Sequence, residues 1–300
     1  MSIFILYHSD FFHHDTGDGH PERPDRLQAC VSALESCEFS NQLNWKIPRP
    51  ILENELEWAH TKEHIKNIKS ICDLGGGYID PDTVVCPESY NIALKSAGAW
   101  LDAVDEIING NSAFVLSRPP GHHAESNRAM GFCLFSNAAL AAIYALKQDG
   151  INKVGIFDWD VHHGNGTQNI VQSNLEIVYV SIHQFPFYPG TGSQLEKGDY
   201  NNVLNIPIPA NLDSKQYLRK FDEDVFPFLQ NFNPDILIIS AGFDAHHKDP
   251  LANINLEAED YAYMTRQCLK INQNLLLGLE GGYDLQALRD CCVSVVKELV

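Results

Sequence analysis

The histidines of this sequence are grouped in a way that suggests shared chemistry. Eight of the thirteen form four adjacent pairs, at positions 13–14, 122–123, 162–163 and 246–247. Carboxylates, imidazoles, glycines and a tyrosine follow short apolar runs that we expect to be strands: RPPGHH at 118–123, DWDVHHGNG at 158–166, SIH at 181–183, AGFDAHH at 241–247 and EGGY at 280–283. In an open parallel sheet the ligand site lies just beyond the carboxyl ends of the strands. We therefore expect these groups to converge on one site.

The segment DWDVHHGNG is the most informative of these. Side chains alternate along an extended backbone, so Asp158, Asp160 and His162 project to one side while Trp159 and Val161 pack on the other. Two carboxylates beside an imidazole in one small volume repel each other, and their charges are costly to bury. A divalent cation bound between them removes that cost. Mixed ligands without a thiolate suit zinc at a catalytic site, and manganese or iron accept the same donors. The alternative is an ordinary hydrogen-bonded strand end.

A third metal ligand should follow another strand. Asp244 comes after the apolar run 236–240 and is the best-placed candidate, with Phe243 packed beneath it. An aspartate there could instead cap the next turn. His246 and His247 lie two and three residues further on, so one of them is a rival for the same ligand position.

Two other motifs suit proton transfer and oxyanion stabilisation. His122 and His123 follow RPPG, and because imidazoles titrate near neutrality a carboxylate can tune one ring differently from the other. Asp158 is a candidate partner for one ring and the neutral Asn165 for the other. Tyr283 follows two glycines, and its phenol can donate a hydrogen bond to a developing oxyanion. A buried structural tyrosine is the simpler interpretation of that residue taken alone.

Alternating strands and helices should position these groups. Continuously apolar runs, typical of strands covered on both faces, lie at 3–7, 113–116, 154–157, 177–181, 236–240 and 275–279. Helical periodicity appears at 89–108, 137–147, 214–229, 256–271 and 285–299. This alternation, without a Pro/Ser-rich linker, predicts one α/β domain with a mostly parallel sheet between helices. The proline-containing stretch 10–87 is expected to wrap the sheet as loops and short helices.

Composition excludes several classes of protein. An apolar share of 44% without a low-complexity tract excludes wholesale disorder. The 21 basic and 39 acidic residues give a net charge of −18, which repels nucleic acid and anionic lipid and suits a cationic substrate better. No apolar run reaches the length of about eighteen residues that spans a membrane. The eight scattered cysteines, without a CxxC motif, indicate reduced thiols, and we expect a cytoplasmic protein.

Seven motifs, in order along the chain, resemble those of the histone deacetylase superfamily, the arginase-like zinc amidohydrolases. They are HPERPDR (20–26), RPPGHHA (118–124), GFCLFSNAA (131–139), DWDVHHGNGTQ (158–168), YPGTG (188–192), AGFDAHHKDPL (241–251) and LEGGYD (279–284). The similarity extends from about residue 7 to residue 299. It implies the arginase/deacetylase fold, a single three-layer α/β/α domain over residues 1–300 around an eight-stranded, mostly parallel sheet.

The resemblance also implies roles for individual residues. His122 and His123 match the histidine pair of the family, with His123 the general base and later the acid, and Asp158 the buried partner of His122. Tyr283 matches the tyrosine that polarises the scissile carbonyl. The implied zinc ligands are Asp160, His162 and Asp244.

Two further sites follow from the same resemblance. The implied monovalent cation, which would be potassium, binds at Asp158, Asp160, His162, Ser181 and Ile182. The implied substrate channel is lined by Gly131, Phe132 and Tyr188, with Leu251 at its rim.

Departures from the family pattern refine this expectation. Asn165 stands where the class I branch has Asp, as in class II and bacterial members. Val85 replaces the Asp that class I members use to hold the substrate backbone, which argues against peptide recognition of that type. Leu251 differs from the glutamate of the polyamine-selective members. Tyr283 is retained, unlike in the weakly active members that carry histidine there.

The expected function is zinc-dependent removal of an acyl group, most simply acetyl, from a lysine side chain or a related primary amine. An acetylpolyamine amidohydrolase is the alternative within the same chemistry, since the acidic surface suits a cationic polyamine. A non-catalytic acyl-lysine binding protein is the alternative outside it. A manganese ureohydrolase shares the fold, but the histidine pair and Tyr283 argue against it. The oligomeric state and the physiological substrate do not follow from the sequence.

Overall fold

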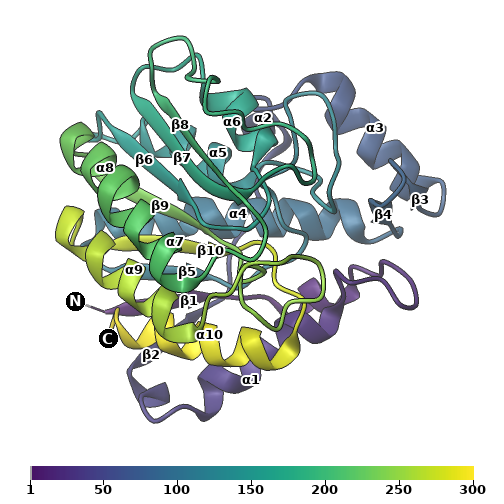
Figure 1. Cartoon of the computed structure of the whole chain (residues 1–300). Helices are drawn as coiled ribbons and strands as arrows, with labels where there is room; N and C mark the ends of the chain where they lie inside the picture. The colour runs from purple at the N-terminus through teal and green to yellow at the C-terminus, as the bar shows by residue number, and fades with distance from the viewer. Residues whose placement is uncertain (1) are drawn as a thin grey trace.

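A computed structural model of the chain describes residues 2–300. Its centre is an eight-stranded sheet in which every pair of neighbouring strands is parallel (Figure 1). Across the sheet the strands are β2 (Leu43–Lys46), β1 (Ile3–Leu6), β5 (Ser112–Val115), β10 (Leu275–Leu279), β9 (Ile236–Ala241), β6 (Val154–Asp158), β7 (Ile177–Gln184) and β8 (Val203–Ile208). A separate antiparallel pair is formed by β3 (Gly77–Tyr78) and β4 (Val84–Val85).

The six strands expected from apolar runs are confirmed, and the two edge strands were not expected. All residues of β5, β6, β9 and β10 are buried, which explains their uninterrupted apolar sequences. The edge strand β2 has two exposed residues out of four, and β8 contains Pro207, which an edge strand tolerates because one side of its backbone has no partner. Exposed residues in β2 and a proline in β8 interrupt the continuous apolar pattern from which the buried strands were predicted.

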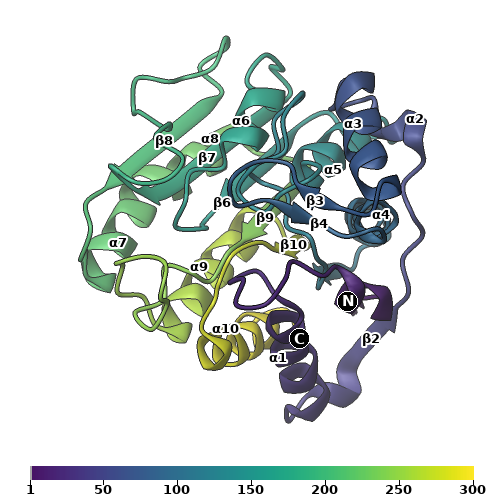
Figure 2. The same cartoon turned by 90° about the vertical axis from the view of Figure 1, so that its right-hand side faces the viewer.

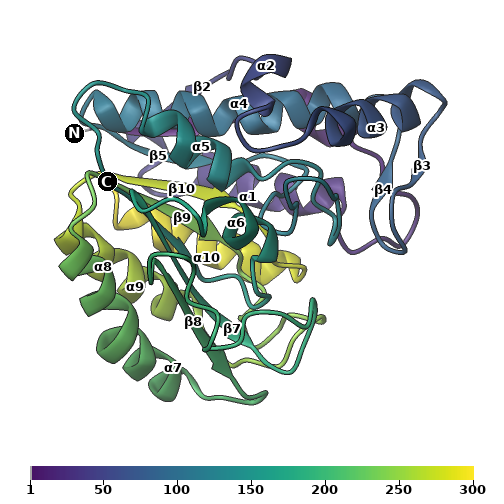
Figure 3. The same cartoon turned by 90° about the horizontal axis from the view of Figure 1, so that it is seen from above.

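Helices cover both faces of the sheet and make the expected three layers (Figure 3). One face is covered by α4 (Ser89–Ile108), α5 (Asn137–Ala145) and α6 (Asn165–Val171). The other face carries α1 (Pro24–Ser36), α7 (Ser214–Lys220), α8 (Phe226–Phe232), α9 (Ala258–Ile271) and α10 (Leu285–Lys297). The first and last of the long helices, α1 and α10, lie side by side (Figure 2).

The expectation for residues 10–87 was wrong in part. Besides loops, a 3-10 turn (Ser9–His13) and the short helix α2 (Glu53–Leu56), this stretch supplies strand β2 of the main sheet. It also forms two helices of ordinary length, α1 with 13 residues and α3 (Lys62–Asp73) with 12. Helix α1 begins at Pro24, a position where the missing N–H of proline costs nothing and its fixed φ favours the helix. The prolines therefore mark helix starts and loop corners in this segment.

The expected helix at 214–229 is interrupted. A π-helical turn, Phe221–Val225, separates α7 from α8. Pro227 follows at the second position of α8 and cannot donate a backbone hydrogen bond into the preceding turn, which accounts for the irregular geometry there.

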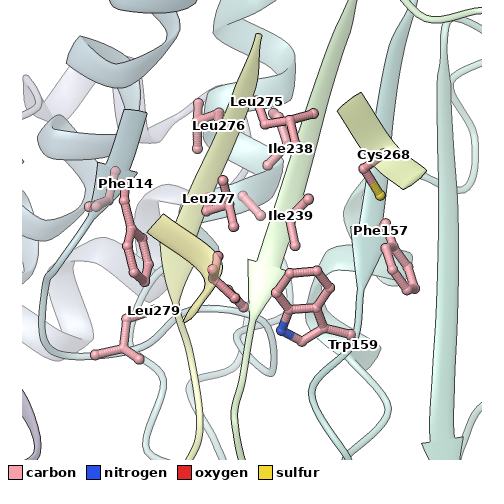
Figure 4. Packing of buried hydrophobic residues seen from close by; sticks show 14 of the residues in the cluster. Phe114, Phe157, Trp159, Ile238, Ile239, Cys268, Leu275, Leu276, Leu277 and Leu279 are labelled. Carbon is pink, nitrogen blue, oxygen red and sulfur yellow. The ribbon is translucent and has the colours of Figure 1, made fainter. Parts of the chain in front are cut away.

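The largest apolar cluster lies between the sheet and both helical layers. Figure 4 shows side chains of the neighbouring strands β10 and β9, among them the register partners Leu277 and Ile239, with Trp159 near the carboxyl ends of the strands. Trp159 is fully buried, as expected from its alternation with Asp158 and Asp160. The core therefore fixes the backbone from which the polar side chains project.

Candidate active site and metal centre

The expected site lies at the carboxyl ends of the central strands. Asp158 is the last residue of β6 and pairs in register with Ser240 of β9 and Ser181 of β7. Chain segments leaving β5, β6, β9 and β10 bring RPPGHH, DWDVHH, AGFD and EGGY to this edge. The neighbouring backbones are joined by hydrogen bonds from Phe243 N to Gly281 O at 3.0 Å and from Gly121 N to the Glu280 carboxylate at 2.7 Å.

Asp160, His162 and Asp244 form one cluster, as expected for metal ligands. One ligand atom from each lies within 4.8 Å of the others. The Nδ1 atom of His162 is 3.1 Å from Asp160 Oδ1 and 3.1 Å from Asp244 Oδ2. Both carboxylates are fully buried and His162 is nearly so. Two carboxylates and an imidazole in this geometry are a donor set for a divalent cation.

The charges of this cluster indicate that it is built for a cation. Burial opposes a charge on His162, yet the hydrogen bonds that its ring donates to Asp160 and Asp244 raise its pKa to about 10. Burial and the neighbouring charge of Asp160 raise the pKa of Asp244 to about 6. The two carboxylates thus attract a positive charge into a space between them, and a metal ion meets that demand with more charge than a proton.

Two glycines leave room for the carboxylates. A Cβ atom on Gly242 would overlap the carboxylate of Asp160, and one on Gly281 would overlap Asp244 and lie 2.5 Å from Asp160 Oδ2. The backbone N–H of Gly281 donates to Asp160 Oδ2 at 2.8 Å, and that of Val161 donates to Asp244 Oδ1 at 2.8 Å. These contacts orient the carboxylates and show that the site accommodates the donor set closely.

His122 and His123 are differentiated by their partners, as their sequence context suggested. The ring centroids lie 4.0 Å apart, and both side chains are buried. His122 Nδ1 is 3.1 Å from Asp158 Oδ2, whereas His123 Nδ1 is 2.8 Å from the amide oxygen of Asn165. Burial opposes charge on both rings, but Asp160 and Asp158 raise the pKa of His122 well above its usual range. Burial and the charge of His122 lower the pKa of His123 well below its usual range.

Tyr283 lies between an aromatic and a cationic side chain, close enough to Asp160 and Asp244 to feel their charges. Its ring is 6.0 Å from that of Phe132, centroid to centroid, and the guanidinium of Arg26 lies 4.9 Å from the ring centroid. Burial, together with the charges of Asp244 and Asp160, raises the pKa of the phenol well above its usual range, against the opposing effect of Arg26. The hydroxyl is therefore a proton donor at neutral pH.

Two of the residues expected to line a channel, Gly131 and Tyr188, lie next to the imidazoles. Gly131 and Phe132 have positive φ angles of 56° and 69°, and a side chain on Gly131 would overlap the His123 ring. The Tyr188 ring is 5.1 Å from His123 and 6.2 Å from His162, and it is 37% exposed. Leu251 is partly exposed on the segment after β9. Phe187, which the sequence analysis did not single out, stacks on His162 at 5.3 Å.

The rival metal ligands His246 and His247 lie in a different cluster. Their rings face Glu257, with His247 Nδ1 3.1 Å from its carboxylate and His246 Nε2 3.6 Å from it. A backbone N–H from Lys248 donates to His246 Nδ1 at 3.2 Å. Neither histidine joins Asp160 and His162 in the groups of neighbouring ligand atoms found within residues 2–300.

Several buried charged residues support the site and were missed as functional candidates. Glu22 accepts hydrogen bonds from Arg26 at 2.9 Å and Arg118 at 2.7 Å, and these two cations lower its pKa to about 2 against the effect of burial. Arg26 also donates to the Gly282 carbonyl at 2.6 Å. Glu280 accepts from the backbone N–H groups of Gly121 and His122. These residues belong to the sequence motifs, but no local pattern indicates which buried partner each of them contacts.

The comparisons with known proteins agree with this geometry. A family model of the histone deacetylase domain matches residues 20–299. The chain belongs to the histone deacetylase family. Within it, the chain is 47% identical to an uncharacterized protein of Synechocystis sp., with 99% of both chains covered. It is 33% identical to the histone deacetylase-like amidohydrolase of Pseudomonas aeruginosa, covering 94% of this chain and 77% of the relative.

Among solved structures, this family member is similar to the crystal structure of the HDA15 HD domain. The TM-score is 0.96 at 37% sequence identity, with 99% of this chain and 89% of the other covered. The expected α/β fold with an eight-stranded sheet is thus confirmed, and the sheet is parallel throughout. Histone deacetylase 15 of Arabidopsis thaliana is 38% identical over 99% of this chain, which spans 55% of that relative's length. No helix within residues 2–300 is long and apolar enough to span a membrane.

Proposed function

We propose that this chain is a zinc-dependent deacetylase that removes an acyl group, most simply acetyl, from the side-chain amine of lysine or a related primary amine. The observation that carries the proposal is the cluster of Asp160, His162 and Asp244 beside a histidine pair and Tyr283. His123 lies 5.9 Å from His162, centroid to centroid, so a substrate amide at the cluster would meet the imidazoles directly. The residues 1–300 would form one catalytic domain.

The residues divide the chemistry between binding and proton transfer. Zinc held by Asp160, His162 and Asp244 would supply a Lewis acid that polarises the scissile carbonyl and lowers the pKa of a water molecule. His123, neutral because of its burial beside His122, accepts a proton from the attacking water. His123 then delivers that proton to the leaving amine, and acetate and a free amine result.

Tyr283 stabilises the charge that develops. The Tyr283 hydroxyl, whose raised pKa keeps it protonated, donates a hydrogen bond to the oxyanion. His122, held by Asp158, places a second imidazole against His123 beside the reacting groups. The aromatic rings of Phe132 and Tyr188 flank the approach and would exclude water from the acyl-amine stem.

We also propose potassium as a structural partner of the site. Asp158 and Ser181 are register partners in adjacent strands, which places the Asp158–His162 turn next to Ser181 and Ile182. Carboxylate, hydroxyl and carbonyl oxygens are ligands that hard cations prefer. The proposed ligands are Asp158, Asp160, His162, Ser181 and Ile182.

A second candidate substrate, an acetylated polyamine, is favoured by acidic groups near the proposed channel. Asp80 and Asp82 lie close enough to Tyr188 that their charges, together with burial, raise the pKa of its phenol. The turn at residues 80–83 also contacts Phe132, the other proposed wall residue of the channel, because the N–H of Phe132 donates to Thr83 Oγ1 at 3.0 Å. Negative charge beside the approach would attract a cationic amine, whether a polyamine or a lysine in a basic segment.

The test is turnover by the purified protein of acetyl-lysine peptides, acetylspermidine and small amides, with and without a chelator. We expect acetate release that disappears with the chelator and returns with zinc. Faster turnover of acetylspermidine than of any peptide would assign the polyamine activity. Binding of acetyl-lysine peptide by zinc-loaded protein without acetate release would show an acyl-lysine binding protein and end the proposal.

A further inference from the structure

One buried carboxylate, Asp249, is tied to two functional segments at once. It lies on the loop that follows β9, between the proposed ligand Asp244 and the proposed rim residue Leu251, and is 6% exposed. One oxygen, Oδ2, accepts the backbone N–H of Tyr283 at 2.7 Å, and the other, Oδ1, accepts the backbone N–H of Leu251 at 2.9 Å. Both oxygens are thus used as hydrogen-bond acceptors, and Asp249 is not among the ligand groups that cluster within residues 2–300.

The segment that Asp249 holds needs an external restraint. Tyr283 follows Gly281 and Gly282, and Gly282 adopts a φ of 113° that other residues rarely take. Glycine allows many backbone conformations, so the position of the next side chain is weakly defined by the local chain. Asp160 anchors this segment before Gly282 through the Gly281 N–H, and Asp249 anchors it after Gly282 through the Tyr283 N–H.

The strength of this second anchor follows from its chemistry. A hydrogen bond from a backbone N–H to a buried carboxylate is stronger than one between neutral groups. The Tyr283 ring itself packs against the guanidinium of Arg26, 4.9 Å from its centroid, and against the Phe132 ring at 6.0 Å. Without the N–H anchor, the phenol keeps its packing partners but loses the contact that fixes its Cα atom.

We propose that Asp249 is a positioning residue: it places the Tyr283 hydroxyl for oxyanion stabilisation and links that placement to the substrate rim at Leu251. The inference rests on the proposed function. Its consequence is specific, because an effect that passes through the Tyr283 hydroxyl disappears when that hydroxyl is absent.

The experiment is a double-mutant cycle between Asp249→Asn and Tyr283→Phe. Asparagine keeps the size of the side chain but has one acceptor oxygen, so it can hold only one of the two N–H groups. We expect Asp249→Asn to lower kcat by about 10- to 100-fold, the factor that a charge-assisted hydrogen bond contributes, with KM changed less than about threefold. In the Tyr283→Phe background the same change should lower kcat by less than about threefold.

The matched control is Asp213→Asn, at the start of α7. Asp213 also accepts a backbone N–H, but from Gln216 of its own helix at 2.8 Å and not from Tyr283 or Leu251, and its substitution should leave kcat unchanged. Equal losses from Asp249→Asn in both backgrounds would overturn the proposal, as would loss of bound zinc in the single variant. Thermal unfolding of each variant verifies that the comparison is made on folded protein.

A second measurement tests the anchor without catalysis. Hydrogen exchange of a peptide covering residues 279–285 should be faster in Asp249→Asn and in Asp249→Ala than in the wild type and in Asp213→Asn. Unchanged exchange would overturn the proposed anchor. If the wild type hydrolyses none of the acyl substrates, the proposed function fails while faster exchange still supports the anchor, so the two failures are distinguishable.

Discussion

The substitution Gly281→Ala should remove the metal site while leaving the fold intact. The new Cβ atom would lie 2.5 Å from Asp160 Oδ2 and overlap the Asp244 carboxylate. A carbon and an oxygen in van der Waals contact stay more than about 3 Å apart, so the carboxylates must move by about 0.5 Å or more. Metal–ligand distances tolerate only about 0.2 Å, so the donor set can no longer close around one ion. No strained backbone angle is involved, because Gly281 does not have a positive φ.

The assay is the metal content of the purified protein, measured together with acetate release and thermal unfolding. Loss of an orienting contact alone costs about 10- to 100-fold in metal affinity, and displacement of two ligands should exceed that. We therefore expect well under one zinc per chain and activity reduced by more than about 100-fold, with a folded protein.

The control for this substitution is Gly155→Ala in strand β6. A Cβ there would meet the side chains of Leu237, Leu229 and Pro234 at 3.2 to 3.3 Å and none of the proposed ligands, so zinc binding should persist. A Gly281→Ala protein with one zinc per chain and normal turnover would refute the assignment of Asp160 and Asp244 as the metal ligands.

Three further outcomes are expected. Tyr283→Phe should lower kcat by about 10² to 10³ with unchanged zinc content, and near-normal turnover would remove this hydroxyl from the mechanism. The double change Asp80→Asn with Asp82→Asn should raise KM for a cationic substrate about three- to tenfold at low salt but not for a neutral amide, whereas equal effects on both would exclude charge selection. His60 is neutral when folded, because burial lowers its pKa to about 3. The stability that the neutral His60 contributes is complete above the unfolded pKa of about 6.5 and is lost as the pH falls towards 3. At pH 4.5 the loss is about 2 to 3 kcal/mol of unfolding free energy. Urea unfolding at pH 7.5 and 4.5 should therefore show a smaller loss for His60→Gln than for the wild type, and equal losses would contradict this origin.

The central part of the fold was predictable because burial leaves a direct trace in sequence. Strands such as β6 and β9 are apolar at every position but the last few because both faces are covered. The edge strands were not predictable for the same reason, since β2 carries Asn44 and Lys46 and β8 carries Pro207. The polar residues of β2 and the proline of β8 are also common in loops, and only the pairing with β1 or β7 identifies these segments as strands.

The candidate site was predictable where one strand end carried several groups. Asp158, Asp160 and His162 are close together because they alternate along one backbone, which sequence alone reveals. Their meeting with Asp244 depends on the pairing of β6 with β9, and the sequence indicated it through the position of Asp244 after another expected strand and through the family resemblance. The anchor at Asp249 depends on a contact across 34 residues, and no periodicity predicts such a contact.

The position of β10 in the sheet has a consequence for how the molecule is assembled. Of the eight strands of the sheet this one is synthesised last, yet it lies between β5 and β9 and pairs with both. Until residues 275–279 are available, the strands that precede them form two separate groups, β2-β1-β5 and β9-β6-β7-β8. Such non-local pairing slows folding. A nascent chain that lacks its final segment therefore has neither a continuous sheet nor the tyrosine that the strand delivers, so structure and chemistry are completed by the same late step.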